Sequence, residues 1–212
     1  MNLFSFFDTK TKATQEPSEL GIEIPVKVKE LVERFDPMIR IEIINISTIH
    51  AQAPISKHPY IELSKRLFET RTNSLEQFTD EDIKVLVAHE LGHIIPKSYF
   101  NFLFFFILSL VAALILWSCF ILSLYPLPGI VLLILFLGYI SRKEEYKADK
   151  FAITEAGISV EAFVQCFSKA DAIRKQEIAL ETGLKHLMKS VFRLMIKTHP
   201  SIAQRISRVR AL

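Results

Sequence analysis

The sequence lacks the features that mark small disulfide-rich proteins and nucleic-acid-binding proteins. It has only two cysteines in 212 residues. Cys119 lies inside a long apolar run and Cys166 outside it, so we expect no disulfide between them and a reducing compartment for the soluble parts. The formal net charge is only +3. No block rich in Lys and Arg with interleaved aromatic residues occurs, so a nucleic-acid partner is not expected.

Charged residues are absent from positions 98 to 141. This run explains most of the mean hydropathy of +0.28, and it exceeds the roughly 20 apolar residues needed to cross a bilayer. A first segment, about 99–124, is long enough to span with tilt, and "YPLPG" at 125–129 breaks it. The second segment, 127–141, is about 22 Å long as a helix, short for a core of ~30 Å. Full crossing, tilting with thinning and re-entry all stay open, and a hairpin in a soluble core is the weaker alternative.

The remaining chain predicts mainly helices with a small sheet, an α+β class. Apolar alternation predicts a strand over Ile39–Ile46 and a weaker one at "PYIELS" near Tyr60. Helical patterns with start and stop signals predict helices at 25–35, with Pro25 in the first helical position, and at 80–96. A helix over 141–157 is expected to continue out of the apolar run, followed by one at about 160–176 and two more, the last beginning after "THPS" at 198–201.

The helix over 80–96 carries the first functional pattern. Its portion "VLVAHELGHII" is apolar on nearly every face, so the helix is expected to be buried and its polar groups to need partners. His89 and His93 are four residues apart and project side by side, which suits two imidazole ligands of one Zn²⁺. Glu90 then lies at the flank, where it can take a proton from the attacking water and pass it to the leaving amine. The alternative is a buried helix with incidental histidines.

A catalytic zinc takes a third protein ligand and keeps one open position. The segment "RKEEYKAD" offers Glu145 and Asp149 on one helix face, with Glu144 about 100° away. One carboxylate of the pair can bind zinc while the other accepts a histidine N–H and fixes its orientation. The alternative is a solvated charged face paired with Lys143 and Lys147.

Three segments together resemble the HtpX-type membrane zinc metallopeptidases: "HELGH" at 89–93, "EYKAD" at 145–149 and "THPSIAQRI" at 198–206, with a hydrophobic hairpin between the first two. The resemblance covers about residues 40 to 206. It implies a zincin-like metallopeptidase domain interrupted by a transmembrane helical hairpin. It also implies one Zn²⁺ per chain held by His89, His93 and Glu145, with Glu90 as general base and acid and Asp149 supporting the ligands.

The C-terminal segment and a short stretch before the zinc helix indicate residue roles less specifically than "HELGH" and "EYKAD" do. The resemblance places His199 near the active site, where it could donate a hydrogen bond to the developing oxyanion, and it makes Arg205 a candidate for supporting the metal ligands or the transition state. The alternative is a helix-start turn at His199, with Arg205 pairing with an acid to hold the last helix. By the same resemblance, "IHAQAP" at 49–54 stands where the family has an edge strand along the substrate groove, with His50 in place of the usual asparagine.

These observations predict a domain order and a membrane topology. The order is an extended lead-in at 1–24, a peptidase half at 25–98, the hairpin at 99–141 and a helical half at 142–212. Because His93 and Glu145 must meet at one metal, both halves are expected on the same side of the bilayer. Basic residues flank the hairpin, which favours the cytoplasmic side; they are Lys97, Arg142, Lys143 and Lys147.

The sequence therefore predicts an integral membrane zinc metalloendopeptidase, with the resemblance suggesting protein quality control. Its expected partners are the lipid bilayer and protein or peptide substrates near it, and no nucleic acid. The metal would sit within roughly 10 Å of the membrane surface, judged from a rise of 1.5 Å per residue. A non-catalytic zinc-binding scaffold or regulator is the rival, and a prenyl-peptide processing enzyme shares the chemistry but needs a longer chain.

Overall fold

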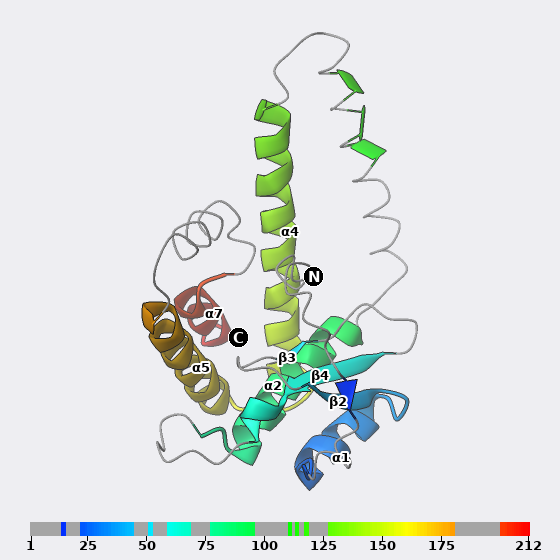
Figure 1. Ribbon diagram of the computed structural model, residues 1–212, viewed down its shortest axis with the longest axis vertical. Coiled ribbons are helices and arrows are strands. Elements are labelled where there is room, and N and C mark those ends of the chain that lie inside the picture. The colour runs from blue at the N-terminus through cyan, green and yellow to red at the C-terminus, as the bar shows by residue number, and fades with distance from the viewer. Residues whose placement is uncertain are drawn as a thin grey trace. The chain divides into compact units, whose positions relative to one another are not determined.

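The structure is a computed structural model that describes residues 14–15, 22–44, 51–52, 59–68, 77–95, 110–111, 113–114, 117–118, 127–180 and 200–212. The chain divides into two compact units. The first comprises residues 1–95, 146–182 and 201–212, and the second comprises 96–145 and 183–200. Among the described residues helices predominate and strands form one small sheet, as the sequence predicts (Figure 1).

The sheet has four strands in the order β1-β2-β4-β3. The central pair, β2 (Arg40–Ile44) and β4 (Tyr60–Ser64), is parallel. The outer strands β1 (Thr14–Gln15) and β3 (Ala51–Gln52) pair antiparallel with β2 and β4 respectively. Both central strands lie where the sequence predicts them, although burial does not alternate along either strand. Strand β3 forms an edge of the sheet within 49–54, where the resemblance predicts an edge strand, and β1 falls in the predicted extended lead-in.

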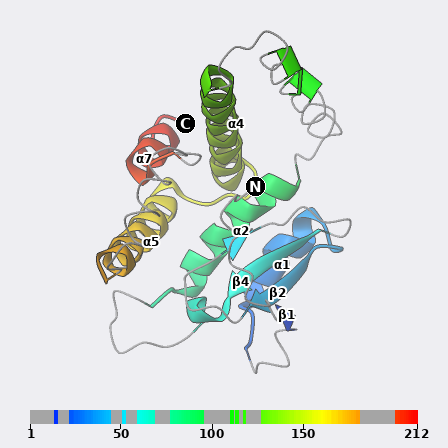
Figure 2. The ribbon, with the colours of Figure 1, turned by 45° about the horizontal axis from the view of Figure 1, so that its top comes forward.

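One face of the sheet packs on α1 (Val26–Phe35) and α2 (Asp80–Ile94). Ile61 and Leu63 alternate with Glu62 along β4, and both apolar side chains enter the core shared with the two helices. Figure 2 shows β2 and β4 beside α1 and α2. A 3₁₀ turn, Lys65–Leu67, follows β4 directly and places Leu67 in the same core.

Helix α2 begins with the capping box that the sequence predicts. The Thr79 hydroxyl accepts a hydrogen bond from the Asp82 backbone N–H, and the Asp82 carboxylate accepts one from the Thr79 backbone N–H. Lys169 lies 2.8 Å from the same carboxylate, so α5 (Val160–Leu180) is tied to the start of α2. These bonds satisfy donors that a helix N-terminus leaves without intrahelical partners.

The helix termini after the apolar run also follow predicted signals. Helix α4 (Leu127–Thr154) ends before Gly157, whose φ of +72° is the left-handed conformation expected after a helix C-terminus. Ser159 accepts a hydrogen bond from the Ala162 N–H at the start of α5. Helix α7 (Ile202–Val209) begins with a capping box between Ser201 and Gln204.

The second segment of the predicted hairpin, 127–141, is helical and forms the first half of α4, whereas most of the first segment, 99–124, lies outside the described residues. Among the described residues, none of the helices combines the length and the apolarity needed to span a bilayer. Within that stretch, Leu110, Leu114 and Trp117 are described, and their side chains are exposed.

Candidate metal centre

Helix α2 brings the two histidines of "HELGH" together. The Nε2 atoms of His89 and His93 are 3.3 Å apart, and the rings meet at 84°. Two nitrogens bound tetrahedrally to one zinc at about 2.0–2.1 Å are roughly 3.3 Å apart. The separation of the two nitrogens therefore suits a shared metal ion. It also confirms that His89 and His93 project side by side, as their spacing predicts.

Glu145 of α4 joins the two histidines. One ligand atom from each of His89, His93 and Glu145 lies within 4.8 Å of the others. Two imidazole nitrogens and one carboxylate oxygen form a donor set typical of catalytic zinc. The buried position of Glu145 and His89 also fits, because a carboxylate taken out of water needs a compensating cation or donor. These three residues could therefore hold a metal ion.

Asp149 fixes His89 from the side away from His93. Its Oδ1 is 3.0 Å from His89 Nδ1. Burial raises the pKa of Asp149, but the hydrogen bond with His89 and the guanidinium of Arg205 outweigh burial and hold that pKa below its usual range. An ionised carboxylate only accepts hydrogen bonds, so Nδ1 of His89 carries the proton and donates it. Its Nε2 is then the nitrogen with the lone pair that a metal requires.

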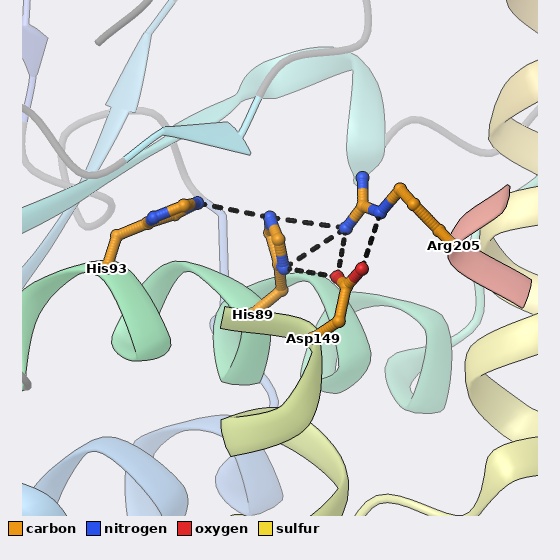
Figure 3. A network of polar contacts seen from close by, with 4 residues as sticks. All are labelled: His89, His93, Asp149 and Arg205. Atoms are coloured by element: carbon orange, nitrogen blue, oxygen red, sulfur yellow. Dashed lines mark hydrogen bonds and ion pairs between the residues drawn. The ribbon is translucent and has the colours of Figure 1, made fainter. Parts of the chain in front are cut away.

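Arg205 holds Asp149 in turn. Its Nε donates to Asp149 Oδ2 at 2.9 Å, and its Nη2 donates to Oδ1 in a short contact. Figure 3 shows the guanidinium reaching the carboxylate from α7, beside the His89 ring. Nη2 is also 3.1 Å from His89 Nδ1, but a guanidinium only donates and that nitrogen already bears a proton, so the contact is one of proximity. Arg205 therefore pairs with an acid, and because that acid is Asp149 the same bonds also fit a role in supporting His89.

The sequence gives no sign that Phe167 belongs to this network. Its ring, on α5, lies 4.0 Å from the Arg205 guanidinium carbon and meets the His89 ring edge-on, with centroids 5.6 Å apart. Phe163 stacks on Phe167 at 4.4 Å. Apolar side chains at helical spacing indicate a core, and only the packing of α5 against α2 and α7 shows that these rings border charged groups.

The remaining predicted residues are placed as follows. Glu90 is buried on α2, next to His89. Glu144 is half-buried on α4 and is not part of the three-residue group. His199 and His50 lie outside the described residues, so their predicted roles stay predictions.

The comparisons with known proteins agree with this geometry. Residues 46–212 match the model of a protein family described as "Peptidase family M48". The crystal structure of Ste24p from S. mikatae superposes with a TM-score of 0.59, at 18% sequence identity, over 88% of this chain and 49% of that chain. The chain thus spans about half the length of that protein, and the likeness concerns the fold. A search of curated protein sequences found no match.

Proposed function

Because the chain belongs to peptidase family M48, we propose that it is a zinc metalloendopeptidase whose metal is held by His89, His93 and Glu145, one ion per chain. The observation that carries the proposal is the convergence of three donors from the "HELGH" and "EYKAD" segments. A zinc ion held there supplies a Lewis acid for the attacking water and the peptide carbonyl.

Glu90 is the proposed general base and acid. It follows His89 on α2, so its side chain leaves the helix about 100° from that of His89 and flanks the two imidazoles. There it accepts the proton of the attacking water and returns it to the leaving nitrogen, so one carboxylate serves both steps. Its burial removes competing water and strengthens the interaction of its charge with reacting groups.

Asp149 and Arg205 are proposed to position the ligands without touching the substrate. Asp149 sets the tautomer and angle of His89, and Arg205 holds both carboxylate oxygens of Asp149. Such partners of a metal-binding histidine raise its basicity and restrict its ring. His199 is proposed, on sequence resemblance alone, as a hydrogen-bond donor to the oxyanion.

The number of donors favours catalysis over a structural zinc site. Structural zinc sites are closed by four protein ligands, whereas catalytic ones keep a position open. Within the part of the chain that the structure describes, the group consists of three residues. A non-catalytic scaffold would need a fourth ligand, for which the sequence offers Glu144 and His199. Glu144 does not join the group, and His199 lies outside the described residues.

The test is Glu90→Gln in the purified full-length chain. We expect stoichiometric zinc, measured by elemental analysis, and casein hydrolysis lowered by at least about 1,000-fold, because the amide cannot accept the proton. Chelation should abolish wild-type activity, and added zinc should restore it. Casein cleavage by Glu90→Gln at the wild-type rate would falsify the proposed mechanism.

We further propose that residues 99–141 form a transmembrane hairpin between two halves of one peptidase domain, 25–98 and 142–212, after a lead-in at 1–24. The uncharged run and the exposed side chains of Leu110, Leu114 and Trp117 support this proposal. The basic flanks favour an active site on the cytoplasmic side. We propose that the peptidase acts there in the quality control of membrane proteins.

A membrane-bound site predicts a preference for substrates held at the bilayer. In liposomes containing the enzyme, a peptide tethered to lipid should be cleaved faster than the same peptide in solution. The tether confines the peptide near the active site and raises its effective concentration. Equal rates for the two peptides at equal total concentration would contradict the membrane proposal and leave the zinc chemistry untouched.

A further inference from the structure

Gly92 lies where helix α2 comes closest to helix α4. A Cβ atom built on Gly92 would stand 2.6 Å from the Ala148 Cα, 2.9 Å from its carbonyl oxygen and 3.1 Å from its Cβ. The two nearest of these atoms belong to the backbone of α4, which cannot rotate away as a flexible side chain can. Ala148 is itself fully buried, so the contact leaves no room on either helix.

The contact falls between the groups that form the metal centre. Gly92 follows His89 by three residues and directly precedes His93. Ala148 follows Glu145 by three residues and directly precedes Asp149. Residues three or four apart share a helix face, so the approach of α2 to α4 at this point determines how far the carboxylates lie from the imidazoles. The distance from His89 Nδ1 to Asp149 Oδ1, 3.0 Å, depends on the same approach.

The magnitudes show that a methyl group is too large here. Carbon atoms in van der Waals contact are about 3.5–4.0 Å apart, so a side chain at position 92 would move α4 away by roughly 1 Å. Zinc–ligand distances vary by only about 0.2 Å between sites. A displacement of that size therefore exceeds what the metal tolerates, even though it is small for the packing of two helices.

We propose that Gly92 is a positioning residue for the metal: the missing side chain lets α4 approach α2 closely enough for Glu145 to join His89 and His93. The inference rests on the proposed zinc site and adds a residue to it that touches neither metal nor substrate. It also gives a reason for glycine at the fourth position of "HELGH", a position that the motif H-E-x-x-H leaves open. Any residue with a side chain there would separate the carboxylates from the histidines.

Gly157 provides a matched control. It is also a glycine in the first unit, and alanine there would be strained because φ is +72°, but a Cβ would meet nothing within 4 Å. Gly157→Ala therefore tests the effect of lost stability alone. Gly92→Ala tests lost stability together with the separation of α2 from α4.

The experiment measures zinc affinity of the full-length protein by competition with a chromogenic chelator, and the visible spectrum after cobalt substitution. We expect Gly92→Ala to weaken zinc binding by about 100-fold or more, above the range typical for partners of metal ligands, and to change the cobalt bands. Gly157→Ala should lower the thermal unfolding midpoint, with zinc affinity within about threefold of wild type. Ala148→Val adds bulk to the same contact from α4 and should behave as Gly92→Ala does; it replaces that variant if Gly92→Ala does not fold.

The outcomes separate the two proposals. Zinc binding at wild-type affinity by folded Gly92→Ala, or by Ala148→Val in its place, overturns the inference while the proposed function stands. Equal losses of affinity in Gly92→Ala and Gly157→Ala also overturn it, because the effect would then be one of general stability. A wild-type protein that binds no zinc overturns the proposed function, and the inference falls with it.

Discussion

The metal centre has two sides of different construction. On α2, three polar residues occur within five positions, and one helix sets their mutual geometry. On α4 and α7, the partners Glu145, Asp149 and Arg205 are separated by up to 60 positions and meet the histidines only through packing. The α2 side is thus local in sequence, and the other side is a product of the tertiary fold.

This difference separates two tasks. The α2 side brings the proposed reactive groups, which the helix holds at fixed angles however the rest of the chain is arranged. The α4 and α7 side brings the proposed third ligand, Glu145, and restrains His89 through Asp149. Changes on the second side should therefore affect metal affinity in order of their distance from the metal, and that order can be measured.

The largest effect on the α4 side should come from Glu145→Ala. Removing the proposed third ligand leaves two imidazoles, and we expect zinc affinity to fall by at least about 1,000-fold, more than for any partner that does not bind the metal. Chelator competition and zinc stoichiometry measure this directly.

Glu144→Ala is the matched control for that variant. Glu144 is the preceding residue on the same helix, carries the same charge and is not part of the ligand group. Its removal should change zinc affinity by less than about threefold, since no proposed metal ligand is lost. If the two variants lost affinity equally, the assignment of Glu145 as the ligand would be wrong.

Asp149→Asn should have the next largest effect. The amide has the same shape, but it removes the charge that faces both His89 and Arg205. Zinc affinity should fall about 10–100-fold. Asp171→Asn, which removes the half-buried partner of the exposed Lys175 on α5, should leave affinity unchanged. An equal fall in both variants would show that net charge rather than the bond to His89 is responsible.

The two sides also differ in how far the sequence predicts them. The capping box at Thr79, the apolar surroundings of "HELGH" and the spacing of His89 and His93 are local features, and all are confirmed. The strands β2 and β4 are predicted for the same reason. The pairing of Glu145 with the histidines needs the resemblance, since spacing alone equally allows a solvated charged face.

Other features have no local signal. The contact of Phe167 with Arg205 and His89 depends on how α5 packs, and an aromatic residue on a helix otherwise indicates only a core. The closeness of Gly92 to Ala148 depends on the path of α4. From the sequence, Arg205 could support the metal ligands or pair with an acid, and its bonds to Asp149, the partner of His89, fit both roles.

Arg205→Lys tests the outermost partner on this side. Lysine keeps the charge but cannot bind both carboxylate oxygens through a planar fork. Because Asp149 remains to orient His89, zinc affinity should fall only about 3–10-fold, less than for Asp149→Asn. Arg208→Lys is the control, since Arg208 lies over the Tyr146 ring on the same two helices without reaching Asp149. If Arg205→Lys lowered zinc affinity as much as Asp149→Asn does, Arg205 would act on the metal ligands directly and not through Asp149.

The smallest effects should come from the two helix caps, which have the same geometry on the two sides. Thr79 and Ser201 each accept a backbone N–H hydrogen bond at 3.2 Å, and replacing either by alanine should lower the free energy of unfolding by about 1 kcal/mol.

Helix α2 has 15 residues and places His89 about three turns beyond its cap, so Thr79→Ala should leave zinc affinity unchanged. Helix α7 has 8 residues, and Arg205 is four positions from Ser201, so fraying there reaches the guanidinium. Ser201→Ala should therefore weaken zinc binding by up to about threefold. Equal zinc affinities of the two variants would mean that the packing of Arg205 between Asp149 and Phe167, rather than the helix that carries it, keeps the guanidinium in place.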